Sequence, residues 1–189
     1  MILHAFLDKL HSIYPLSEGL RNELEENTKI VSLAKHDHIL REGQCAKQVT
    51  AVLCGMLRSY YIHEGEDITS RFTQAGEVVL SVNSFYSQKT GYEFIEAMEK
   101  TEIAQISFEQ QQHLLHKYLE YNFIVRYFTE RYYASSEEHL FRLRKQSAEQ
   151  KWHFFQNTYP HLIEQIPLKH IASFLGMRLE TLSRVRSKY

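Results

Sequence analysis

The side chains with the most versatile binding chemistry lie close to the C-terminal end of the chain. Between residues 178 and 188, guanidinium, ammonium, hydroxyl and carboxylate groups follow one another closely. Groups of these types can hold phosphate oxygens and can exchange hydrogen bonds with the edges of base pairs. The surrounding segment 140–189 is basic, with nine Lys and Arg against three Asp and Glu, whereas residues 1–139 contain 13 against 20. This asymmetry favours a polyanionic partner at the C-terminal end, the alternative being a solvated face that is basic by chance.

The apolar residues from Leu168 to Val185 are spaced as in two short helices that cross at a tight turn. Ala172 lies where the crossing helices come closest and must be small, and Gly176 lies in the turn, where the backbone needs a positive φ. The positions that would face inward are all apolar, namely Ile171, Leu175, Met177, Leu182 and Val185. This pattern predicts a DNA-binding helix-turn-helix. The alternative is an ordinary helical hairpin whose glycine only ends the first helix.

The remaining positions of the second helix form a polar and basic face, with the composition of a helix that enters the major groove. Arg178 occupies the position before this helix, where Ser, Thr, Asp or Asn would cap the free backbone amides. The missing cap costs on the order of 1 kcal/mol, so we expect the start of the helix to fray in the free protein and to order on DNA. The predicted DNA-contacting residues are Lys169, Arg178, Leu179, Glu180, Thr181, Ser183, Arg184, Arg186 and Lys188.

The chain that precedes this motif changes its pattern twice. The first ~30 residues place apolar side chains at helical spacing. From about Ile30 to Ser107, short apolar runs alternate with turn residues, as in an antiparallel sandwich or barrel, and Glu64-Gly65-Glu66 is typical of a hairpin turn. From Phe108 onward no glycine occurs before Gly176. Apolar and aromatic residues at helical spacing then predict a helix of roughly 20 to 30 residues, at about 110–140.

This long helix has an apolar and aromatic surface, from Leu114 to Tyr132, that is too wide for one contact. Packing against its own domain explains one face, and we expect a second copy of the chain to cover the rest. The sign of the charge changes within Leu140–Gln146. We therefore expect a β-rich domain at 1–140, which includes the long helix, and a helix-turn-helix domain at 141–189. The second domain has a small core of its own, with Trp152, Phe154, Phe155, Tyr159, Leu162, Ile163 and Ile166.

Other classes of protein find little support in the sequence. The pairs His36/His38 and His113/His116 have metal-ligand spacing, but neither has further ligands nearby, so we expect surface pairs and no metal. Two cysteines are too few for a disulfide framework or an iron–sulfur site. The chain lacks the ~18-residue apolar run of a membrane span and the features of a signal peptide, which predicts a cytoplasmic protein. Enzyme motifs such as Gly-x-Ser-x-Gly and His-Glu-x-x-His do not occur, so we expect no enzyme.

The segment Ile166–Lys188, IPLKHIASFLGMRLETLSRVRSK, resembles the DNA-binding element of the Crp/Fnr family of bacterial transcription regulators. The likeness is closest over Glu180–Arg184, and the order of elements is similar over essentially the whole chain. The length is similar to that of short family members of the Bacteroidetes type, which have little or no C-terminal wing. The resemblance implies an α+β fold. It would comprise an N-terminal antiparallel β-roll of the cyclic nucleotide-binding type with flanking helices, a long dimerisation helix and a C-terminal helix-turn-helix.

The resemblance also implies a function. A homodimer would regulate transcription by binding a pseudo-palindromic operator in double-stranded DNA, with RNA polymerase as a further candidate partner and no membrane. Glu180 and Arg184 would reach base edges, and phosphates would be held by Thr181, Lys169, Arg186 and Lys188. In the cyclic-AMP-responsive members an arginine that reads guanine stands where this chain has Leu179, so the operator is expected to differ.

Family members that bind a cyclic nucleotide have a phosphate-binding cassette that opens with Gly-Glu and ends with Arg-Ser or Arg-Thr. Gly76 and Glu77 fit the opening, but Gly91 and Tyr92 take the places of the arginine and the hydroxyl residue. Burying a phosphate without a guanidinium is costly, and Tyr92 would crowd a small pocket. We therefore expect a degenerate effector pocket at these four residues, no cofactor, and no cyclic AMP bound in the usual way. The alternative function is a sensor of a nucleotide or another anion, with weak or secondary DNA binding.

Overall fold

The computed structural model describes residues 2–188, with the backbone alone at position 161. The chain divides into two compact units, one of residues 1–59 and 72–131, the other of residues 60–71 and 132–189. Three elements contribute to both units: strands β4 (Met56–His63) and β5 (Glu66–Gln74), and the long helix α5 (Leu119–Lys145). Within residues 2–188, no helix is both long enough and apolar enough to cross a membrane.

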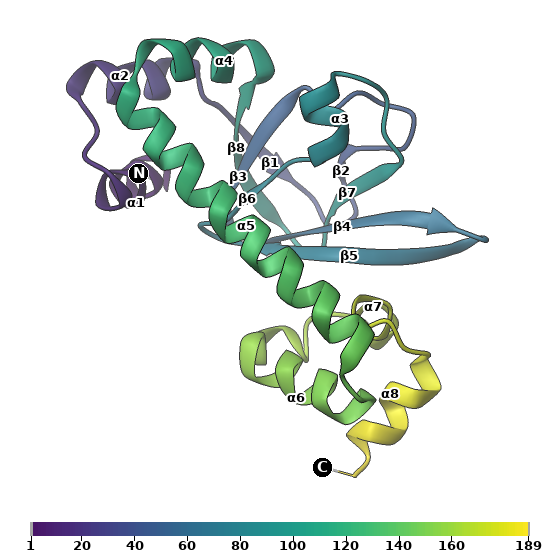
Figure 1. Cartoon of the computed structure of the whole chain (residues 1–189). Coiled ribbons are helices and arrows are strands. Elements are labelled where there is room, and N and C mark those ends of the chain that lie inside the picture. The colour runs from purple at the N-terminus through teal and green to yellow at the C-terminus, as the bar shows by residue number, and fades with distance from the viewer. Residues whose placement is uncertain (1, 189) are drawn as a thin grey trace. The chain divides into compact units, whose positions relative to one another are not determined.

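Two four-stranded sheets form the β-rich part of the chain (Figure 1). The order in one sheet is β1-β8-β3-β6, and in the other it is β2-β7-β4-β5. The strands not yet placed are β1 (Lys29–Leu33), β2 (His38–Leu40), β3 (Gln48–Cys54), β6 (Val78–Val79), β7 (Glu93–Ala97) and β8 (Thr101–Ser107). The pairs of β1 with β8, β3 with β8, β3 with β6 and β2 with β7 are antiparallel, which confirms the predicted sheet class.

An apolar core lies within this β-rich part. It joins residues from both sheets, with Val52, Leu57, Phe85, Ala97 and Ile103 fully buried. Phe85 comes from helix α3 (Val82–Ser87), which the sequence did not predict. The turn from β3 to β4 requires glycine at position 55, because φ is +85° there and a β-carbon would lie 2.6 Å from the Thr101 hydroxyl.

The N-terminal helices pack around the first half of α5 (Figure 1). These N-terminal helices are α1 (Ile2–Ile13) and α2 (Glu18–Asn27), as predicted. Helix α4 (Phe108–Lys117) packs in the same core. Leu7 and Leu20 are fully buried in the shared core, alongside Ile124 of α5. The hydroxyl of Ser17 accepts a hydrogen bond from Leu20 N–H and thereby caps α2.

The predicted helix at about 110–140 is two helices, α4 and α5, separated at Tyr118. The Tyr118 backbone is extended, with φ −122°, and its hydroxyl donates to Glu23 at 2.8 Å. Helix α5 then runs for 27 residues to Lys145, beyond the end expected from the sequence. Of these 27 residues only Tyr121 and Ile124 are buried.

The C-terminal helices form a second core. They are α6 (Ala148–Thr158), a 3-10 turn at Pro160–Leu162, α7 (Leu168–Phe174) and α8 (Leu179–Arg186). Ser147 opens α6 through a capping box with Gln150. The buried ammonium of Lys151 donates to the Leu143 carbonyl, 3.2 Å away, and so satisfies an acceptor in the last turn of α5. The buried residues of this core include Trp152, Phe155, Leu162, Ile166 and Phe174.

His139 of α5 makes this second core sensitive to pH. Its ring stacks on Phe174 with the centroids 4.5 Å apart, and burial, followed by the nearby charges of Lys151 and Arg142, lowers the pKa of His139 below 6.5. The unfolded chain, with its ordinary pKa, therefore takes up this proton before the folded protein does. As the pH falls through about 6.5, the free energy of unfolding should fall with it.

We expect His139→Phe, which keeps a ring on Phe174 without a titrating group, to reduce this dependence. The measurement is the difference in Tm between about pH 8 and about pH 5.5 for the wild type and the variant, because other histidines contribute equally to both. An equal loss of Tm in the two proteins would show that His139 does not titrate in this way.

Candidate nucleic-acid interface

The two helices predicted from the C-terminal pattern are α7 and α8, and the turn between them has the geometry of a Schellman motif. Gly176 has φ +61°. Its N–H donates to the Ser173 carbonyl, and the N–H of Met177 donates to the Ala172 carbonyl, both at 3.0 Å. These two bonds satisfy carbonyls at the end of α7 and redirect the chain into α8. The glycine therefore ends the first helix and also forms the turn of a helix-turn-helix.

The inward positions of the motif are occupied as the pattern predicts. Ile171, Ala172, Leu175, Leu182 and Val185 are buried, whereas Met177 is only partly buried because it lies in the turn. Gly176 also lies close to the end of the long helix. A β-carbon at this position would come within 2.7 Å of a Leu143 methyl group.

The predicted DNA-contacting side chains lie on the outside of the motif. Eight of the nine are exposed and Thr181 is partly exposed, the eight being Lys169, Arg178, Leu179, Glu180, Ser183, Arg184, Arg186 and Lys188. Glu180 and Arg184 are one helical turn apart and so share a face of α8. Arg178 precedes α8 with an extended backbone and makes no capping hydrogen bond with its side chain, as the sequence suggested.

Two of the cations near the end of α8 contact α6. Lys188 Nζ lies 2.8 Å from Glu149 Oε1, and this partner lowers the pKa of the Glu149 carboxyl below its ordinary value. The Arg186 guanidinium lies 5.8 Å from the centre of the Trp152 ring. A phosphate that binds Lys188 therefore meets a cation whose charge is already partly neutralised by Glu149. The sequence pattern did not indicate this contact.

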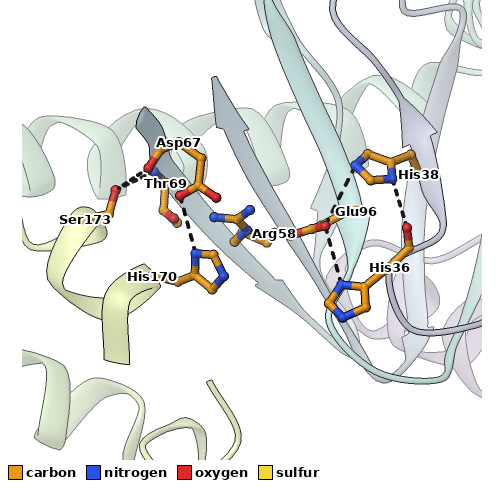
Figure 2. A network of polar contacts seen from close by, with 8 residues as sticks. All are labelled: His36, His38, Arg58, Asp67, Thr69, Glu96, His170 and Ser173. Carbon is orange, nitrogen blue, oxygen red and sulfur yellow. Dashed lines mark hydrogen bonds and ion pairs between the residues drawn. The ribbon is translucent and has the colours of Figure 1, made fainter. Parts of the chain in front are cut away.

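Polar residues of α7 contact the tip of the hairpin formed by β4 and β5 (Figure 2). The Ser173 hydroxyl bridges the backbone at Asp67 and Thr69, and His170 Nδ1 lies 3.6 Å from Asp67 Oδ1. The sequence contained no signal for this contact, because a serine inside an apolar helix pattern is equally consistent with exposure to solvent.

No protein-family model matches the chain, and no curated protein matches it by sequence. Solved structures do match. FixK2 from Bradyrhizobium japonicum has a TM-score of 0.73 at 21% identity, over 85% of this chain and 83% of its own. The c-di-GMP-responsive global regulator CLP from Xanthomonas campestris has a TM-score of 0.73 at 15% identity, over 91% of each chain.

A protein described as a regulator of the Crp/Fnr family, from Eubacterium rectale, matches with a TM-score of 0.72 at 18% identity, over 94% of this chain and 87% of its own. The chain shares the fold of these three proteins. The predicted α+β architecture, with a β-roll followed by a long helix and a helix-turn-helix, is thereby confirmed.

In this fold, the opening of the expected cassette is a turn between β5 and β6. Gly76 has φ +82°, and its carbonyl accepts a hydrogen bond from Lys9 Nζ at 2.7 Å. The Glu77 carboxylate accepts one from the Gln74 backbone N–H at 2.9 Å. Both residues thus take part in the local structure of this turn.

The position of the cassette arginine is closed by nearby side chains. A β-carbon on Gly91 would lie 3.0 Å from Ser84 Cβ and 3.6 Å from Ser81 Oγ. The Ser81 hydroxyl in turn donates to the Glu93 carboxyl, whose pKa is raised by burial. The structure therefore places the carboxyl of Glu93 beside the start of α3, and position 91 has no arginine to bind a phosphate there. The side chain of Tyr92 is 56% exposed and is therefore not buried within the roll.

We expect cyclic AMP to leave the Tm of this protein unchanged, because a phosphate at this position would meet Glu93 without a guanidinium. A ligand at about 100 times its Kd stabilises the folded state by about 2.7 kcal/mol, a change that a thermal shift assay detects easily. A clear rise in Tm with increasing cyclic AMP concentration would refute this expectation.

The histidine pair of the roll lies beside a buried ion pair (Figure 2). Arg58 Nε lies 2.8 Å from one oxygen of Glu96, and both residues are buried. The other oxygen of Glu96 lies 3.8 Å from His36 Nδ1 and also 3.8 Å from His38 Nε2. In the part of the chain that the structure describes, no three His, Cys, Asp or Glu side chains are arranged to hold a metal ion. This geometry supports a role for Arg58 in neutralising the charge of Glu96 inside the sheet.

Proposed function

We propose that the chain is a sequence-specific DNA-binding transcription regulator. The observation that carries this proposal is the helix-turn-helix of α7 and α8, whose apolar residues are buried and whose basic and polar residues are exposed on α8. A helix of this kind can enter the major groove, where each base pair presents a distinct set of donors and acceptors. Arg184 is suited to guanine and Glu180 to cytosine, while Leu179 offers only apolar contact, for example to a thymine methyl.

We further propose that the regulator is a homodimer joined along α5. This helix has 27 residues and only two are buried, although its surface includes large apolar side chains. Leu119, Tyr133 and Leu140 are exposed, and they are spaced by multiples of seven residues, which places them on one face of the helix. A second copy of the chain is the occupant that fits, because two recognition helices related by a two-fold axis read a pseudo-palindrome.

The effector site of this regulator is degenerate in our proposal, with Gly91 and Glu93 in place of a phosphate-binding arginine. The anion-sensing alternative would need a cation at the start of α3, where the carboxyl of Glu93 lies instead. We therefore favour DNA binding that does not depend on a cyclic nucleotide.

Binding of the full-length protein to double-stranded DNA at several salt concentrations tests the proposal. Neutralising each phosphate changes the slope of log K against log salt by about −0.9, so several contacts per subunit predict a steep decline between about 50 and 200 mM salt. Affinity that is absent, or that does not change with salt, would contradict the proposed function.

A further inference from the structure

The tip of the β4–β5 hairpin belongs to the same compact unit as the helix-turn-helix, residues 60–71 being grouped with 132–189. Strand β5 is at the edge of its sheet, in the order β2-β7-β4-β5. An edge strand has backbone N–H and C=O groups without a partner strand, and those groups need other partners where they are buried. Thr69 on this edge is only 2% exposed, so its backbone N–H group needs a hydrogen-bond partner within the protein.

Ser173 of α7 supplies that partner. Its hydroxyl accepts a hydrogen bond from Thr69 N–H at 2.8 Å and donates one to the Asp67 carbonyl at 3.1 Å (Figure 2). A hydroxyl is both donor and acceptor, so one side chain satisfies the two backbone groups that a neighbouring strand would otherwise bind. The contact between His170 and the Asp67 side chain, at 3.6 Å, lies beside these two bonds.

The same serine also holds the turn that leads into the recognition helix. While the Ser173 hydroxyl binds the hairpin, the Ser173 carbonyl accepts from Gly176 N–H at 3.0 Å. The hairpin tip, α7 and the turn before α8 are therefore joined through one residue. A displacement of the tip would be transmitted to α7, and through the turn to α8.

We propose that Ser173 is a positioning residue for DNA binding: it clamps the β4–β5 hairpin tip to α7 and so fixes the orientation of α8. This inference rests on the proposed function. A recognition helix with a fixed orientation loses less conformational freedom on binding than a loosely held one. Since the Ser173 hydroxyl is committed to the hairpin, its loss should weaken DNA binding without removing any phosphate contact.

The test compares Ser173→Ala with Ser173→Thr, which keeps the hydroxyl. A second variant, Ser173→Val, has nearly the shape of Ser173→Thr but lacks the hydroxyl, so it removes the same hydrogen bonds. The control is Ser135→Ala, which removes an exposed hydroxyl from α5 at a position outside the predicted DNA-contacting set. All variants are made in the full chain. Hydrogen exchange of the Leu182 and Val185 backbone amides reports whether the helix-turn-helix is folded.

In Ser173→Ala we expect faster hydrogen exchange at the Thr69 amide and about tenfold weaker binding to the best duplex from a random-site selection, with the salt slope of the wild type. Ser173→Val should weaken binding to a similar degree, and Ser173→Thr should retain both the exchange protection and the affinity of the wild type. Wild-type affinity in Ser173→Ala and Ser173→Val, or a smaller salt slope in either, would overturn the inference. If the wild type itself binds no duplex, the proposed function fails instead, and Thr69 protection still reports on the clamp.

Discussion

Replacing Arg184 by alanine is expected to remove the preference for one base pair in each half-site of the operator. Arg184 is exposed on α8, one turn beyond Glu180, where its guanidinium can donate two hydrogen bonds to a guanine. Losing such a contact costs about 1–3 kcal/mol of discrimination. Affinity for the selected operator should therefore fall by roughly 5- to 150-fold per half-site, while affinity for unrelated DNA changes little.

Lys188→Ala is the matched comparison for this experiment. A lysine that holds a phosphate contributes equally to all sequences, so its removal should weaken operator and unrelated DNA alike and should lower the salt slope by about one per subunit. The pairing of Lys188 with Glu149 reduces this effect, because the free protein already neutralises part of the charge. If Arg184→Ala also weakened every duplex to the same degree, Arg184 would be a phosphate contact, and the assignment of the reading face would be wrong.

Placing a charge at Tyr133 is expected to break the dimer and, with it, most of the operator affinity. Tyr133 lies on the α5 face shared with Leu140, and its side chain is 67% exposed in the single chain. Tyr133→Glu would bury a carboxylate without a partner between two α5 helices, which strongly disfavours association. Linking two binding modules raises affinity by about 10²- to 10⁴-fold, so a monomer should lose a factor of this order.

Ser135→Glu is the control, because it adds the same charge at an exposed position on another side of α5. Analytical ultracentrifugation should show a dimer for the wild type and Ser135→Glu, and a monomer for Tyr133→Glu. Binding to a single half-site should be similar in all three proteins. A dimeric Tyr133→Glu variant would mean that the subunits associate through a different surface.

The helix-turn-helix was predictable from the sequence because local rules determine it. Gly176 must have positive φ, and a few apolar residues at fixed spacing, such as Ile171 and Leu182, define the buried face of two short helices. The change from helices to short strands and back to helices was predictable for the same reason, since each kind of element has its own periodicity, whereas α3 was not predicted. The break at Tyr118 was not, and the Tyr118 hydroxyl bonds there to Glu23, which is 95 residues away in the sequence.

The contacts that modify the site were also beyond the sequence pattern. The Ser173 hydroxyl bonds to backbone groups more than 100 residues earlier in the chain, which no side-chain pattern records. The pairing of Glu93 with Ser81, and the approach of Gly91 to Ser84, depend on how α3 lies against the roll. From the sequence, the missing arginine at Gly91 was visible, but the carboxyl that lies beside that position was not.

The most direct test of the central claim is selection of binding sites from random double-stranded DNA with the full-length protein. Our account predicts enrichment of a pseudo-palindrome whose two half-sites are about one helical turn apart, bound without any added nucleotide and with affinity that decreases steeply as salt increases. Recovery of no preferred sequence, together with binding that does not respond to salt, would contradict it.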